Sequence, residues 1–177
     1  TPATTGAWDC HAHVFGPYDH YPLAANRTYT PPEALVQSYL SLLDQMGIEH
    51  GVLVHPSAYG NDYRLLFETL QNNKRLRGVI VANAENSLNF TALHDQGIRA
   101  ARFSHRSGAG TNFVGSASMD DFESLKSTLA NANLHAEVWT DCVALQDIDK
   151  ILMSSPVPIV IDHMGGFNPQ NGINDLG

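Results

Sequence analysis

The sequence predicts an α/β domain of the TIM-type (β/α)8 barrel class, truncated to about the first six strands. Short apolar runs alternate with stretches of helical period, which implies parallel strands joined by right-handed crossovers. Residues 51–54, 78–81 and 159–161 are continuously apolar, as parallel strands covered on both faces should be. Polar side chains follow several strands, where a barrel places its active site: His13, His55, Ser104, Thr140 and His163.

An open Rossmann-type sheet is the alternative parallel architecture. It would place a glycine fingerprint directly after its first strand, and here Asp-Cys-His-Ala-His occupies that place. A complete (β/α)8 barrel needs about 250 residues, whereas this chain has 177. We therefore expect residues 1–177 to form one incomplete barrel domain that ends before strands seven and eight.

The expected strands lie at residues 7–14, 50–55, 76–83, 98–104, 135–140 and 158–164. Helices are expected at residues 31–46, 61–73, 87–96, 119–133 and 143–155. For the first helix, Thr30 is the predicted N-cap, Pro31 the first helical residue and Glu33 the partner in a capping box. Gly47 should end that helix, and Ser118 with Asp121 should cap the fourth.

Composition and charge exclude several classes of partner. The formal net charge is −8, so nucleic acid is not expected to bind. No run approaches the roughly 20 apolar residues that span a bilayer, and residues 1–6 do not resemble a signal peptide. We expect a cytoplasmic protein without membrane contact, whose two cysteines, Cys10 and Cys142, are free buried thiols.

Three histidines are the strongest candidates for chemistry. Residues two apart in a strand share a face, so Asp9, His11 and His13 should point the same way. His163 follows the sixth apolar run and is the natural third member. Three imidazoles could bind zinc or manganese and activate a water. They could instead donate hydrogen bonds to a substrate carbonyl during attack by water.

A carboxylate base and a substrate clamp complete either chemistry. Asp9 and Asp162 are the nearby carboxylates, although Asp162 should face away from His163. Arg102 and Arg106, at the end of the fourth strand and after it, could hold a carboxylate bidentately. Tyr29 and Ser57 are hydroxyl donors in neighbouring loops. Nothing in their spacing links His20, His55 or His105 to the histidine pair.

Five segments, in order along the chain, resemble one branch of the amidohydrolase superfamily. The branch contains 2-pyrone-4,6-dicarboxylate lactonase and related sugar lactonases and lactone isomerases. The matching segments include Trp-Asp-Cys-His-Ala-His at the first strand and Ile-Asp-His-Met-Gly at the sixth, and they cover residues 8–17, 26–32, 54–60, 99–103 and 161–165. The resemblance spans nearly the whole chain.

The resemblance implies a (β/α)8 barrel that hydrolyses or isomerises a carboxylated lactone without a bound metal or other cofactor. The family's carbonyl-polarising histidines fall on His11, His13 and His163. Its substrate-carboxylate contacts fall on Tyr29, Ser57, Arg102 and Arg106, and Trp139 stands where the lactonase has a tyrosine. The family's water-activating aspartate on strand eight and an arginine after strand six have no counterpart before Gly177.

Three interpretations remain open. The first is a metal-independent lactonase acting on a 2-pyrone-4,6-dicarboxylate-like substrate. The second is a metal-dependent amidohydrolase or decarboxylase, with zinc or manganese held by His11, His13 and His163. The third is a non-catalytic truncated remnant that binds a ligand or assembles. An incomplete barrel also exposes strand edges, so self-association through the open edge is a further expectation.

Overall fold

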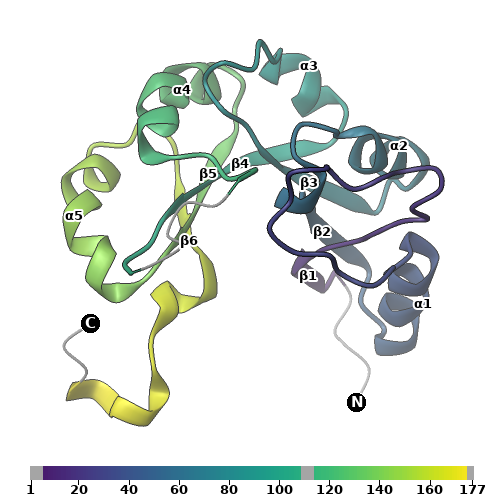
Figure 1. Ribbon diagram of the computed structural model, residues 1–177, viewed down its shortest axis with the longest axis horizontal. Helices are drawn as coiled ribbons and strands as arrows, with labels where there is room; N and C mark the ends of the chain where they lie inside the picture. The colour runs from purple at the N-terminus through teal and green to yellow at the C-terminus, as the bar shows by residue number, and fades with distance from the viewer. Residues whose placement is uncertain (1–5, 109–113, 175–177) are drawn as a thin grey trace.

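The computed structural model describes residues 6–108 and 114–174, and it contains one parallel sheet covered by helices (Figure 1). The sheet order follows the chain order, β1-β2-β3-β4-β5-β6, and every neighbouring pair is parallel. The strands are β1 (Trp8–Ala12), β2 (His50–Val54), β3 (Leu76–Val81), β4 (Ile98–His105), β5 (His135–Thr140) and β6 (Ile159–Ile161). This is the predicted architecture, a six-stranded part of a TIM-type barrel.

Five α-helices connect successive strands and lie along the outside of the curved sheet (Figure 1). They are α1 (Val36–Met46), α2 (Arg64–Asn72), α3 (Phe90–Asp95), α4 (Met119–Asn131) and α5 (Cys142–Met153), with 3₁₀ turns at Ser57–Tyr59, Asp162–Gly166 and Pro169–Asn174. In the described residues, no helix is both long and apolar enough to cross a membrane. The first five residues, on which part of the signal-peptide prediction rested, lie outside the description.

The main core lies between the sheet and the helices. Phe103 of β4 and Phe122 of α4 are fully buried, and their ring centroids are 5.4 Å apart. A Cβ on Gly51 would collide with the Tyr39 hydroxyl, so β2 needs glycine where α1 crosses it. A second, smaller apolar cluster on the sheet comprises Val54, Val79 and Ala100.

The predicted start of the first helix is wrong. The helix begins at Val36, after Leu35, which makes no side-chain capping bond. Glu33 instead accepts a 2.7 Å hydrogen bond from the backbone N–H of Tyr18, and Ala34 pairs with Phe15 in an antiparallel bridge. The Glu33 side chain therefore binds the backbone of a distant loop and does not cap the helix, which local sequence could not reveal.

The other predicted helix ends agree better with the structure. Gly47 ends α1 in a left-handed conformation with φ of 69°. Ser118 and Asp121 form the predicted capping box of α4, and each side chain accepts from the backbone N–H of the other residue. These signals are local, because cap and capped N–H lie within three residues of each other.

Candidate active site

A cavity of about 300 Å³ opens where the strands end at their carboxyl termini. Five of the seven predicted site residues line it: His13, Tyr29, Ser57, Arg102 and His163. His11 and Arg106 are not part of this wall. The remaining wall is formed by Thr28, His55, Pro56, Val81, Ser104, Gly115, Ser116 and Trp139.

The three predicted histidines do come together. The ring centroid of His11 lies 5.1 Å from that of His13 and 5.0 Å from that of His163. His11 lies behind the other two, on the wall of a second hollow inside the barrel that also includes His163. The cluster therefore has two members facing the cavity and one supporting them from the barrel interior.

His13 has its tautomer assigned by a hydrogen bond. Its Nδ1 lies 2.8 Å from the carbonyl oxygen of Val54, which can only accept, so Nδ1 carries the proton. Partial desolvation lowers the pKa of His13 below its usual value of 6.5, more strongly than the Val54 hydrogen bond raises it, and the nearby Arg102 charge lowers it further. At neutral pH the Nε2 atom of His13 therefore offers a lone pair rather than a proton.

His11 is more strongly perturbed. Desolvation, followed by the positive charge of Arg102, lowers the pKa of His11 to about 4, so the ring is neutral at pH 7. His55, expected to have no link to the site, is on the cavity wall and almost fully buried. Its Nε2 lies 2.7 Å from the carbonyl of Gly60, and burial lowers its pKa to about 4. We assign His55 a supporting role in the turn that carries Ser57.

The prediction that Asp162 faces away from His163 is wrong. Strand β6 ends at Ile161, and His163 and Met164 both have φ of 52°, in the left-handed region that non-glycine residues seldom adopt. The strand therefore ends before Asp162, so the alternation of side chains along a strand, on which the prediction rested, does not apply to Asp162 and His163. Asp162 is buried and forms an ion pair with Arg102, with Nε and Oδ2 2.7 Å apart.

The expected common face of the first strand is also absent. The Asp9 carboxylate accepts a 3.0 Å hydrogen bond from Tyr39 of α1, on the helix-covered side, while His11 faces the barrel interior. The register of β1 against β2 shifts between Asp9 and Ala12, which breaks the two-residue alternation. Asp9 is therefore a structural partner of α1.

Arg102 and Arg106 share one aromatic neighbour. Their Cζ atoms lie 5.0 Å and 4.3 Å from the ring centroid of Trp139, within the range of a cation–π interaction. The guanidinium has five N–H donors, so the Nε contact of Arg102 with Asp162 does not exhaust it. Arg102 remains suited to bind an anionic substrate group, whereas Arg106 supports Trp139 from outside the wall.

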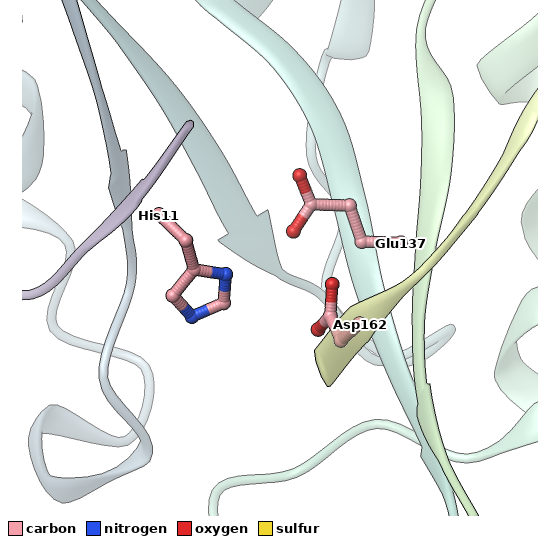
Figure 2. A group of neighbouring side chains, drawn as sticks. All are labelled: His11, Glu137 and Asp162. Atoms are coloured by element: carbon pink, nitrogen blue, oxygen red, sulfur yellow. The ribbon is translucent and has the colours of Figure 1, made fainter. Parts of the chain in front are cut away.

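A buried polar group that the sequence did not indicate lies inside the barrel. His11, Glu137 and Asp162 reach it from β1, β5 and the end of β6, and their side chains point toward one another (Figure 2). Their potential ligand atoms all lie within 4.8 Å of one another. Within residues 6–108 and 114–174, two buried side-chain atoms lack a hydrogen-bond partner, and both belong here: His11 Nε2 and Glu137 Oε2.

This group fits a divalent ion better than the predicted three-histidine set does. Neutral imidazole and carboxylate oxygens are ordinary zinc and manganese ligands. The three histidines do not form such a ligand group among the described residues. Glu137 could have been suspected from sequence, because His135, Glu137 and Trp139 alternate along β5 toward one face.

Comparison with known proteins gives concordant results. The family model described as amidohydrolase matches residues 8–176. A 4-sulfomuconolactone hydrolase of Rhizobium radiobacter is 33% identical over 175 residues, which cover 97% of this chain and 57% of that protein. A 2-pyrone-4,6-dicarboxylate hydrolase of Comamonas testosteroni is 28% identical over 96% of this chain and 55% of its own length.

A solved structure is similar over the same region. It is a probable 2-pyrone-4,6-dicarboxylic acid hydrolase of Acinetobacter baumannii with citric acid bound, and it matches with a TM-score of 0.80 at 30% identity. The match covers 97% of this chain and 63% of that one. The chain thus spans between one half and two thirds of the length of these relatives. The family match extends over nearly all of the described barrel, and the chain belongs to the amidohydrolase family.

Proposed function

We propose that this protein hydrolyses a carboxylated lactone of the 2-pyrone-4,6-dicarboxylate type. The observation that carries the proposal is the convergence of His13, Arg102 and His163 on one cavity at the carboxyl ends of the strands. The similar proteins named as lactone hydrolases act on anionic lactones according to their names, and the similar Acinetobacter structure holds citric acid, a tricarboxylate.

Different residues of the cavity wall would carry out different parts of the reaction. The Arg102 guanidinium would bind a substrate carboxylate, with Tyr29 and Ser57 as hydroxyl donors beside it. His163 would donate a hydrogen bond to the lactone carbonyl as negative charge develops on its oxygen. The lone pair on His13 Nε2 would accept a proton from the attacking water. Water adds to the carbonyl carbon, the ring C–O bond breaks, and the ring oxygen takes up the proton that His13 accepted from the water.

The direct test is ring opening of 2-pyrone-4,6-dicarboxylate by the purified chain, followed by absorbance with and without a chelator. Chelator-insensitive turnover is the expected result. Arg102→Lys is the matched variant for the carboxylate contact, because it keeps the charge and removes the planar fork. We expect it to raise KM more than it lowers kcat. A folded sample that opens neither this lactone nor 4-sulfomuconolactone would contradict the proposal.

A metal-dependent amidohydrolase or decarboxylase is the second candidate. The specific observation in its favour is the pair of unmatched buried atoms on His11 and Glu137. Turnover that a chelator abolishes and zinc or manganese restores would support it over the first candidate. The cytoplasmic location, the small-molecule partner and self-association through the open edge stay predictions.

A further inference from the structure

The turn that follows β2, residues 56–60, carries one of the hydroxyl groups of the cavity wall. Ala58 and Tyr59 of this turn are buried, whereas Ser57 is half-buried and lines the cavity. Within residues 6–108 and 114–174, the Ser57 hydroxyl makes no hydrogen bond to another residue. It is therefore free to bind a ligand, and its direction depends on how the backbone of the turn is held.

His55 closes this turn. Its side chain is 2% exposed, and its Nε2 lies 2.7 Å from the carbonyl oxygen of Gly60, so the Nε2–H donates across the turn. The backbone N–H of Gly60 in turn donates to the carbonyl oxygen of Ser57 at 2.9 Å. Gly60 has φ of 55° and ψ of −123°, a conformation that suits glycine. The bond from His55 therefore holds the residue that orients the backbone of Ser57.

A second loop packs against the same turn. A Cβ on Gly115, in the loop after β4, would lie 2.5 Å from the carbonyl oxygen of Ser57. Gly115 also lines the cavity, so this close approach occurs beside the ligand. A displaced turn would therefore lose its packing against Gly115 as well as the direction of the Ser57 hydroxyl.

The turn also supports the loop that carries Tyr29. The backbone N–H of Ala24 donates to the carbonyl oxygen of Ala58 at 2.9 Å. Arg27 donates to the carbonyl oxygen of Ala24 and to the hydroxyl of Thr30, each at 2.9 Å. These bonds lie on both sides of Tyr29 in the chain, and Tyr29 lines the cavity. The positions of both hydroxyl donors therefore depend on the turn.

We propose that His55 is a positioning residue: by holding the turn, it directs the Ser57 and Tyr29 hydroxyls toward an anionic group of the substrate. The identity of that substrate rests on the proposed function, whereas the positioning can be measured without turnover. A displacement of about 1 Å in a positioned group can cost about 100-fold in rate. His55 acts through the backbone of the turn and not by contact with the reacting atoms.

The test measures binding of citrate, a tricarboxylate probe, to the whole chain by calorimetry. His55→Leu removes the donor to Gly60 and keeps a side chain of similar size, and we expect it to weaken citrate binding about tenfold. His55→Gln keeps an N–H donor and should recover most of the affinity. In a background that lacks both hydroxyls, Ser57→Ala with Tyr29→Phe, His55→Leu should weaken binding by less than about twofold.

Control variants locate the probe and the effect. Arg102→Lys should weaken citrate binding, which would place the citrate in the cavity. Tyr39→Phe also removes a partly buried side-chain hydrogen bond, to Asp9, but should bind citrate as the parent does. Circular dichroism checks that each variant is folded. Should His55→Leu not fold, His55→Asn replaces it, because its amide is too short to reach Gly60.

Four results would overturn the proposal. One is no citrate binding by the folded parent chain, and another is equal affinity in the parent and in folded His55→Leu. The third is an equal loss of affinity on His55→Leu with and without the two hydroxyls, which would make His55 a general structural residue. The fourth is no recovery in His55→Gln. A parent chain that binds citrate but opens no lactone would contradict the proposed function and leave the positioning role of His55 standing.

Discussion

The helix-covered face of the sheet and the face toward the barrel interior are built from different side chains. Under the helices, Phe103 and Phe122 are fully buried in an apolar layer. On the inner side, the buried residues include Glu137 and Asp162, and Arg102 is largely enclosed. Burial on the first face is favourable in itself, whereas burial of charge must be offset by partners. Stability should therefore depend mainly on the outer face and chemistry on the inner one.

The largest expected effect is on the outer face. Phe122→Ala should lower the free energy of unfolding by about 3–5 kcal/mol, because it removes a buried ring and leaves a cavity against Phe103. Chemical denaturation followed by circular dichroism measures this change. Phe167→Ala, at a partly exposed ring after β6, is a size-matched control. An equal loss of unfolding free energy in both variants would contradict the expectation that stability depends mainly on the helix-covered face.

The next effect is on turnover. His163→Ala should reduce kcat/KM by about 10² to 10³, the usual result of removing one donor to a developing oxyanion. It should change the free energy of unfolding little, because the side chain is exposed. Steady-state ring-opening rates and a denaturation curve on the same sample separate the two. Full activity in this variant would remove His163 from the proposed mechanism.

A smaller effect comes from pH. The pKa of His13 is lowered from 6.5, and the proposed base must be neutral, so kcat/KM should be constant near pH 7. Below the lowered pKa it should fall about tenfold per pH unit. His11 and His55 remain neutral in the fold to about pH 4, whereas unfolded histidines protonate near 6.5. Stability should therefore also decline as pH falls from 6.5 toward 4. Circular dichroism at each pH checks that the loss of kcat/KM is not caused by unfolding. A value of kcat/KM that stays constant at acidic pH would contradict the role of His13 as the base.

The smallest effect on stability should come from the buried ion pair. The double variant Arg102→Met with Asp162→Leu replaces both charges with apolar groups of similar size. We expect a change in unfolding free energy of about 1 kcal/mol or less, because the pair's desolvation cost largely cancels its attraction. The same variant should lose turnover. Asp162→Leu alone is the informative comparison, since it leaves the Arg102 charge unpaired and should therefore lower the free energy of unfolding more than the double variant does.

Much of the fold follows from local sequence. The six strands, their order and the helices between them could be predicted because apolar periodicity and capping residues act over a few positions. The capping box at Ser118 and Asp121 and the glycine at position 47 are examples that the structure confirms. The start of α1 could not be predicted, because Glu33 accepts a hydrogen bond from the backbone N–H of Tyr18, fifteen residues earlier.

The candidate site, like the fold, could be predicted from the sequence only in part. Sequence alone indicated His13, His163, Arg102, Tyr29 and Ser57, since residues at the carboxyl ends of parallel strands meet at one mouth, and the cavity brings these five together. Only the tertiary structure decided that Asp9 turns toward Tyr39, that Asp162 turns inward to Arg102, and that Glu137 faces His11. The physical reason is that a register shift in β1 and a left-handed turn after β6 reset which way side chains point. Alternation along a strand carries no information about either.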